Sequence, residues 1–255
     1  MIRPRIIPTL LLHEGALTKT TQFKKHNYIG DPMNAVHLFN QLKADEIVFL
    51  DIDASKEGRS IDLDLVREIG EEARMPFSVG GGIRDLETIA ACVQAGAERV
   101  ILGEVMYTDP DFIKRAVDRF GSSTISVCID YHQNWLKQTK VAYRNGSKSV
   151  SIHPKEQALK MQALGVGEII FQSIDRDGTQ KGYDTPFLKE IAEELKIPIV
   201  ALGGAATKED LKQLALDTSV RGIAAGSLFI YHGNNKGVLI NYPERKFIAD
   251  LYLKS

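Results

Sequence analysis

The segment Phe49-Leu50-Asp51-Ile52-Asp53 recurs later in the chain as Phe171-Gln172-Ser173-Ile174-Asp175, at an offset of 122 residues (171 minus 49). The pair Gly81-Gly82 recurs at the same offset as Gly203-Gly204. A third pair of blocks, at an offset of 123, is Gly103-Glu104 and Gly226-Ser227. Chance alignment at glycines does not readily give three blocks at nearly one spacing. The sequence therefore predicts two duplicated halves.

Short β-branched runs alternate with amphipathic stretches along the whole chain. Eight runs read as strands: Arg5–Leu11, Glu46–Ile52, Phe77–Val79, Arg99–Leu102, Thr124–Ile129, Glu168–Gln172, Ile199–Leu202 and Val220–Ala225. Most are apolar on both faces, which is typical of parallel strands covered by helices. Helix N-caps are expected at Asp31, Asp85, Asp109, Thr185 and Thr207. Eight such units favour a closed (β/α)₈ TIM barrel over an open sheet, with residues 1–255 as one domain.

Composition excludes several classes of partner. The 255 residues include 32 basic and 33 acidic side chains, so the net charge of −1 favours neither nucleic acid nor an anionic membrane. Cys92 and Cys128 match neither a disulfide framework nor a zinc spacing. The N-terminus lacks the apolar segment of a signal peptide, and no run approaches a membrane span. We expect a cytoplasmic protein without metal or organic cofactor.

The second half ends three of its strands in turns of glycine and other small residues. Gly178, Gly204 and the pair Gly226-Ser227 each follow a predicted strand. Glycine lets backbone N–H groups approach an anion, and the loops after strands seven and eight are the usual phosphate cradle of such barrels. Gly82 supplies a matching turn in the first half, but Glu104 stands where the second half has Ser227, and a carboxylate repels phosphate. We expect one good phosphate site, with Glu104 facing a cation or an uncharged part of the ligand.

Acid–base chemistry has one clear candidate. Asp130 directly follows the fifth predicted strand, where it is either a general acid or base or a cap for the next loop. The equivalent position in the first half falls near Leu11 and offers no titratable group. Asp51, Asp177 and Lys19 remain as candidate substrate-site residues.

Five segments together resemble the cyclase subunit of imidazole glycerol phosphate synthase: Phe49–Ile52, Val79–Ile83, Ser173–Thr179, Gly182–Asp184 and Gly203–Ala205. The similarity covers nearly the whole chain, and Ser-Ile-Asp-Arg-Asp-Gly-Thr followed by Gly-Tyr-Asp is highly specific. The resemblance implies a barrel of duplicated halves that forms a heterodimer with a glutaminase subunit. That partner delivers ammonia through the barrel axis.

The resemblance also implies roles for charged residues at the N-terminal face of the barrel. The family's ammonia gate is a ring of salt-bridged charges, and the matching residues are Arg5, Glu46, Arg99 and Glu168. The family has a lysine where this chain has Arg99, and Glu98 matches an acidic residue at the glutaminase interface. A purely structural ion network is the alternative interpretation.

The other end of the barrel departs from the family. Of two catalytic aspartates, Asp130 matches one while the other falls on Leu11, and a lysine is replaced by His13. An Asn-Thr pair at the first phosphate site is Gly103-Glu104 here. The pattern is similar to a divergent branch in surface-polysaccharide pathways, where a third amidotransferase protein forms an acetamidino group on a nucleotide sugar. The alternatives are an authentic cyclase of histidine biosynthesis and a regulatory barrel that binds a phosphorylated sugar.

Overall fold

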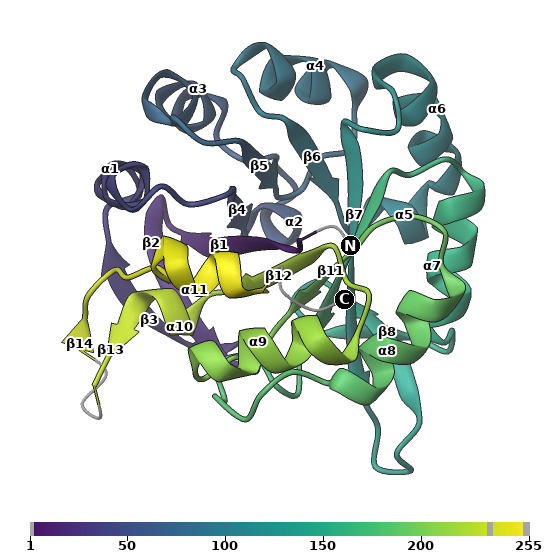
Figure 1. The fold of residues 1–255 in the computed structure, drawn as a ribbon. Helices are drawn as coiled ribbons and strands as arrows, with labels where there is room; N and C mark the ends of the chain where they lie inside the picture. The colour runs from purple at the N-terminus through teal and green to yellow at the C-terminus, as the bar shows by residue number, and fades with distance from the viewer. Residues whose placement is uncertain (1–2, 234–236, 252–255) are drawn as a thin grey trace.

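Eight parallel strands close into a barrel in a computed structural model that describes residues 3–233 and 237–251 (Figure 1). The strands follow the order β1, β4, β5, β6, β7, β10, β11, β12, and β12 pairs again with β1. Their bounds are β1 Arg5–His13, β4 Ile47–Asp51, β5 Phe77–Gly80, β6 Arg99–Leu102, β7 Ile125–Gln133, β10 Glu168–Ser173, β11 Ile199–Leu202 and β12 Gly222–Ala225. Each predicted strand is present, and the (β/α)₈ barrel is confirmed.

Helices alternate with the strands and form the outer layer. The longer ones are α1 Pro32–Leu42, α3 Leu63–Glu72, α4 Leu86–Gln94, α6 Pro110–Phe120, α7 Pro154–Ala163, α8 Thr185–Glu194, α9 Lys208–Asp217 and α11 Arg245–Asp250; short helices are α2 Ala54–Glu57, α5 Val105–Thr108 and α10 Ser227–Ile230. Four of the predicted N-caps accept a backbone N–H, namely Asp31, Asp85, Asp109 and Thr207. None of the described helices is both long enough and apolar enough to cross a membrane.

The prediction of Thr185 as an N-cap was wrong. Asp184 precedes α8, and Thr185 is already the first helical residue, followed by Pro186. Asp184 makes no side-chain capping bond. Pro186 fits the second helical position because the first turn needs no N–H donor there, so the proline does not fix where the helix begins.

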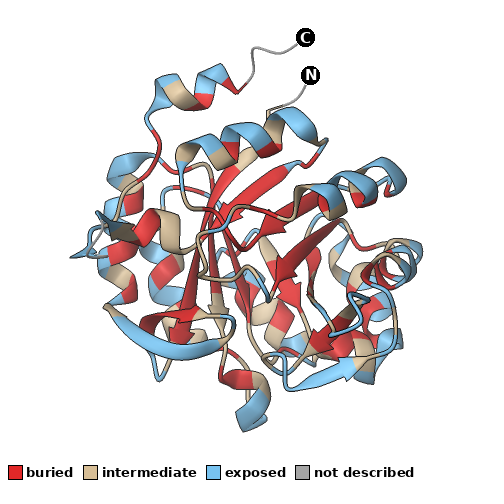
Figure 2. Ribbon diagram, turned by 90° about the horizontal axis from the view of Figure 1, so that it is seen from below, coloured by how far each residue is buried: buried red, intermediate tan, exposed pale blue. Residues whose placement is uncertain are grey.

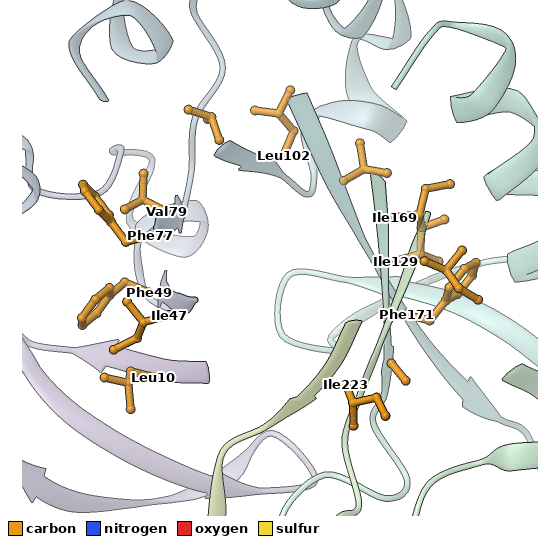
Figure 3. Close-up of a cluster of buried hydrophobic side chains, with 14 of the residues drawn as sticks. Leu10, Ile47, Phe49, Phe77, Val79, Leu102, Ile129, Ile169, Phe171 and Ile223 are labelled. Carbon is orange, nitrogen blue, oxygen red and sulfur yellow. The ribbon is translucent and has the colours of Figure 1, made fainter. Parts of the chain in front are cut away.

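Hydrophobic side chains on each barrel strand alternate between two cores. Ile6 and Phe49 face the helices and belong to the larger core, part of which is drawn in Figure 3. Ile7 and Val48 instead face the barrel axis, where they pack with Ile101. The barrel strands are therefore buried on both faces, while the helices expose their outer sides (Figure 2). Deleting a buried ring such as Phe49 from such a core typically costs about 3–5 kcal/mol.

Two antiparallel excursions were not predicted from the sequence. The strand β1 turns back into β2 Ala16–Thr21 and β3 Lys24–Gly30, and β7 turns back into β8 Thr139–Tyr143 and β9 Lys148–Val150. An antiparallel excursion of two strands thus follows the first barrel strand of each half. A small ribbon joins β13 Tyr231–His232 to β14 Gly237–Val238.

Candidate active site at the barrel mouth and charged ring at its floor

Asp130 lies in a cavity of about 120 Å³ at the C-terminal end of the barrel. Leu11, Cys128 and Gln172 line the same cavity. The Cys128 thiol donates to Asp130 Oδ1 at 3.5 Å. Burial raises the pKa of Asp130 to about 7, although the hydrogen bond from the Cys128 thiol opposes this shift; the charge of Asp177 adds a smaller rise. Both protonation states of Asp130 are therefore available near neutral pH, as a general acid or base requires.

A second, smaller pocket adjoins the Asp130 cavity and contains most of the predicted phosphate site. It is lined by four predicted phosphate-binding residues, Gly178, Gly204, Gly226 and Ser227, together with Lys19 and Asp177. Leu11 and Gln172 line both pockets, so the two form one continuous mouth. The structure thus brings together residues from three loops and from β2, as an anion cradle would need.

Lys19 supplies a buried positive charge to this phosphate pocket. The side chain is only 5% exposed, and its Nζ donates to the Thr9 carbonyl oxygen at 2.7 Å. Burial lowers the pKa of Lys19 to about 8, against the opposing effect of Asp177. A Cβ atom at Gly226 would lie 2.2 Å from Lys19 Nζ, so a side chain there would displace the ammonium group. An anionic ligand would restore the favourable environment that the ammonium lost on burial.

Asp177 is held by the neighbouring excursion. Its carboxylate accepts from Thr20 Oγ1 at 2.8 Å, and burial raises its pKa. The loop that contains Asp177 packs closely on β2, since a Cβ at Gly178 would lie 2.3 Å from the Thr20 carbonyl oxygen. Asp177 therefore fixes the loop against β2 and sets the charge near Lys19.

The first half contributes differently to the mouth. Gly82 lines the Asp130 cavity and does not join the other predicted phosphate-binding residues. Glu104 pairs with Arg144 from the turn between β8 and β9, at 2.6 Å between Oε1 and Nε. Glu104 thus faces a cation, as expected from the sequence. Its negative charge is balanced within the protein.

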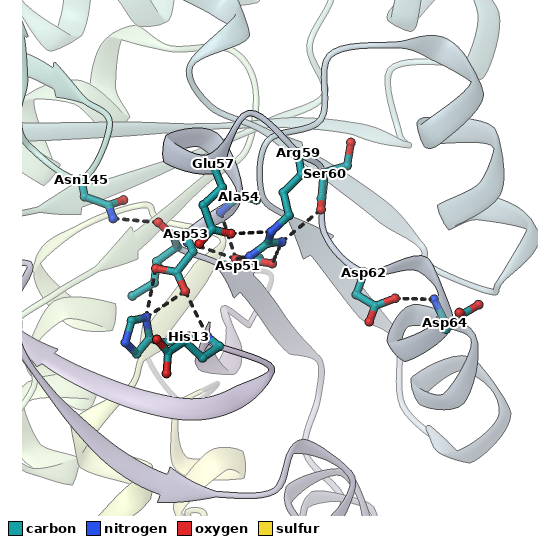
Figure 4. Close-up of polar contacts among 12 residues, drawn as sticks. His13, Asp51, Asp53, Ala54, Glu57, Arg59, Ser60, Asp62, Asp64 and Asn145 are labelled. Carbon is teal, nitrogen blue, oxygen red and sulfur yellow. Dashed lines mark hydrogen bonds and ion pairs between the residues drawn. The ribbon is translucent and has the colours of Figure 1, made fainter.

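Asp51 lines the mouth, but its carboxylate is already engaged (Figure 4). It accepts from the backbone N–H groups of Asp53 at 3.0 Å and Ala54 at 3.1 Å, and it pairs with Arg59 at 2.5 Å. The adjacent Asp53 binds His13 Nδ1 at 2.8 Å. Both carboxylates therefore order the loop after β4, and His13 is held at the edge of that loop.

Charged side chains form a ring at the N-terminal floor of the barrel. Arg5 on β1 bridges Glu46, just before β4, and Glu168 on β10. Arg99 Nε lies 3.7 Å from Glu168 Oε1, and Ser78 Oγ donates to Glu46 Oε1 at 2.9 Å. The structure thus brings all four predicted gate residues together.

The basic and acidic side chains of the ring pair with one another, which offsets the cost of burying them. Glu46 and Glu168 are each 3% exposed, and an unpaired buried carboxylate costs several kcal/mol. Burial raises the pKa of Glu168, although Arg5 and Arg99 oppose this shift. Glu98, predicted at a partner interface, has a side chain that is 51% exposed and contacts Arg99 at 3.2 Å. The ring is therefore continuous with an exposed acidic group.

A small cavity lies on the barrel axis above the ring. Thr9, Ser78 and Ser126 line it together with Glu46, Glu168 and apolar residues. The hydroxyl oxygens of Thr9 and Ser126 are buried, and within residues 3–233 and 237–251 they have no hydrogen-bond partner. Thr9 also lines the phosphate pocket. Polar groups therefore extend along the axis from floor to mouth.

The sequence analysis missed Tyr107, Arg144 and Gln172 as residues of the mouth. Gln172 is the last residue of a predicted strand, and Asp130 directly follows another. Its place at the C-terminal end of a strand was therefore a signal that it lies at the mouth. Arg144 reaches the mouth only through the β8–β9 turn, and no local sequence signal predicts that approach. Tyr107 follows β6 in the short helix α5, where its aromatic character alone would suggest core packing.

Comparison with known proteins agrees with this architecture. Residues 5–236 match the family described as histidine biosynthesis protein. A protein of Leptospira interrogans is 42% identical over 247 residues, covering 96% of this chain and 97% of its own length; it is provisionally named an imidazole glycerol phosphate synthase subunit HisF.

Two further relatives have similar coverage. The Pseudomonas aeruginosa protein provisionally named subunit hisF2 is 40% identical, with 96% of this chain and 97% of its own length covered. The imidazole glycerol phosphate synthase subunit HisF of Lachnoclostridium phytofermentans is 39% identical, with 89% and 88% covered. With the barrel and its two-ended polar site in place, this chain belongs to the histidine biosynthesis protein family.

Proposed function

We propose that the chain is the barrel subunit of a two-protein glutamine amidotransferase. A glutaminase subunit binds the floor, where Glu98 is exposed beside Arg99, and ammonia passes along the barrel axis to the mouth. The observation that supports this most is the ring of Arg5, Glu46, Arg99 and Glu168 next to a cavity where two hydroxyls have no hydrogen-bond partner among the described residues. Such hydroxyls offer hydrogen bonds to a small polar molecule in transit.

At the mouth, the proposed chemistry is nitrogen transfer to a phosphorylated ligand. Lys19 and the loops of Gly178, Gly204, Gly226 and Ser227 hold the phosphate, which positions the rest of the ligand beside Asp130. Asp130 exchanges protons with the nitrogen or the acceptor, because its pKa of about 7 suits both directions of transfer.

We infer that the acceptor differs from the substrate of the histidine pathway. Leu11 occupies the position of the family's second catalytic aspartate in this cavity, and the pair of Glu104 and Arg144 alters the side where the family's first phosphate would bind. Losing one positioned acid or base costs roughly 10²–10⁴-fold in rate. The proposed acceptor is a nucleotide sugar, which is itself phosphorylated and on which a third amidotransferase protein forms an acetamidino group, in a cytoplasmic step of surface polysaccharide synthesis.

The second candidate is an authentic imidazole glycerol phosphate synthase cyclase, which the intact phosphate pocket and Asp130 favour. A spectrophotometric assay with ammonium salt and the open-chain ribulosyl aminoimidazole carboxamide ribonucleotide separates the two. We expect no turnover by the folded chain while it still stimulates a cognate glutaminase. Clear turnover that Asp130→Asn abolishes would establish the cyclase instead.

A further inference from the structure

Tyr107 places a buried hydroxyl in the mouth that the proposed chemistry has not used. Its ring stacks on Tyr143, with centroids 5.2 Å apart and planes inclined by 28°. The hydroxyl oxygen is buried and lacks a hydrogen-bond partner in the part of the chain that the structure describes. An unsatisfied buried hydroxyl is unfavourable, so a ligand that supplied a partner would bind with an advantage.

The neighbours of this hydroxyl form a cluster rich in oxygen. Asp130 and Gln172 line the same cavity as Tyr107, and the Cys128 thiol lies between them, 3.5 Å from Asp130 Oδ1 and 4.0 Å from Gln172 Oε1. Leu11 and Ile101 line the same cavity and are apolar. A carboxylate, an amide oxygen and a phenol therefore line one cavity at the mouth of the barrel.

The phenol remains protonated in this setting. Burial raises the pKa of Tyr107 far above its ordinary value, and the charge of Asp130 adds to the effect. The Tyr107 oxygen can therefore donate one hydrogen bond and accept another at any physiological pH. The lining of the cavity also includes Arg144, but its guanidinium is paired with Glu104.

We infer that Tyr107, Asp130 and Gln172 form a holding site for ammonium at the exit of the barrel axis. Ammonium offers only N–H donors, and the three side chains offer oxygen acceptors. Ile101 lines both the axial cavity and the mouth cavity, which places the site where the proposed path ends. Ammonia that arrives along the axis takes the proton of the Asp130 carboxyl, which gives the bound ammonium and a carboxylate. Return of that proton to Asp130 leaves neutral ammonia and a protonated carboxyl, so the nucleophile is released beside the phosphate pocket.

The inference rests on the proposed function, but its test needs no glutaminase and no acceptor. The chain is labelled with ¹³C at aspartate Cγ, and the Asp130 resonance is assigned from its absence in Asp130→Asn. Ammonium chloride is then titrated, with potassium chloride as a control of similar ionic size. We expect a saturable shift of the Asp130 resonance with ammonium that potassium does not produce.

Tyr107→Phe keeps the ring and the stacking but removes the hydroxyl, and it should weaken ammonium binding about tenfold, since one hydrogen bond to a charged ligand is lost. The matched control, Tyr28→Phe, removes an exposed phenol on β3 and should leave binding unchanged. No saturable shift, an equal shift with potassium, or an unchanged affinity in Tyr107→Phe would each overturn the site. Glutaminase stimulation without ammonium binding would refute this inference alone, whereas ammonium binding without stimulation would refute the proposed function.

Discussion

At the scale of single residues, the sequence predicts where a side chain lies along a strand, but it does not predict which residues surround that side chain. The end of the fifth barrel strand identified Asp130 as a rim carboxylate, because parallel strands bring their C-terminal ends to one face. The burial around Asp130 arises from Leu11, Cys128 and Gln172, which come from three different strands. No local pattern predicts that surrounding, so the raised pKa could not be read from the sequence.

Asp130 should make the fold less stable as pH rises through a defined window. Its pKa is 3.8 in the unfolded chain and about 7 when folded, so the folded state binds the extra proton and stability falls between pH 4 and 7. This rise in the pKa of Asp130 corresponds to a change of at most about 4 kcal/mol in the free energy of unfolding. Asp130→Asn removes this pH dependence. In urea unfolding, the free energy of unfolding of the variant should therefore rise relative to that of the wild type as the pH increases to 7. If the two free energies of unfolding changed in parallel with pH, the raised pKa of Asp130 would be contradicted.

Lys19 should control phosphate binding. Replacing it with Met removes the buried charge, and calorimetry with inorganic phosphate at pH 7 should show affinity reduced about tenfold or more. Because the pKa of Lys19 is about 8 in the free protein, wild-type affinity should also fall at pH 9. Lys24→Met, on the exposed part of β3, is the control and should bind normally. Equal affinities of Lys19→Met and the wild type would place the phosphate elsewhere.

At the scale of elements, the sequence was sufficient to predict the apolar strands of the barrel, but it was not sufficient to predict the polar strands outside it. The barrel strands are buried on both faces, and their β-branched runs are distinct. The strand β3 is largely exposed and contains Lys24, Lys25 and His26, so nothing in its composition separates it from a loop. Its order comes from pairing with β2, whose alternation of threonine with other residues is the one signal that could have indicated a strand.

Two threonines at helix starts provide a matched comparison. Thr207 begins α9 with a capping box, in which its hydroxyl accepts the Asp210 N–H while Asp210 accepts the Thr207 N–H. Thr207→Ala should therefore lower the free energy of unfolding by about 1 kcal/mol. Thr185→Ala should change it by less than about 0.5 kcal/mol, because Thr185 is inside α8 and makes no cap. Urea unfolding measures both, and equal losses would restore Thr185 as a cap.

At the scale of the whole molecule, the eight strand–helix units favoured a closed barrel, the duplicated pattern supported it, and the barrel is closed. The residues of the floor ring were predicted from family resemblance alone. In the structure Arg5, Arg99 and Glu168 are the first residues of β1, β6 and β10. Their geometry was not predictable, since the central role of Arg5 depends on how β1, β4 and β10 are placed around the barrel. Closing the barrel positions one guanidinium between two carboxylates that are far apart in sequence.

The ring should tolerate loss of Arg99 better than loss of Arg5. Arg5→Met leaves Glu46 and Glu168 buried without their main partner, and such a loss typically costs about 3–5 kcal/mol. Arg99→Met leaves Glu168 paired with Arg5 and should cost about 1 kcal/mol or less. Unfolding in urea at pH 7 compares the two variants. If Arg5→Met were as stable as Arg99→Met, Arg5 would not be the centre of the ring.

Glutamine hydrolysis by a cognate glutaminase, followed as glutamate formation with and without this chain, tests most directly whether the barrel receives ammonia. We expect a one-to-one complex in which the chain stimulates hydrolysis at least tenfold. Arg99→Ala should still bind but lose most of that stimulation, because the ring is broken where Glu98 meets the partner. A folded chain that neither binds the glutaminase nor changes its rate would contradict ammonia delivery and leave the floor ring a structural network.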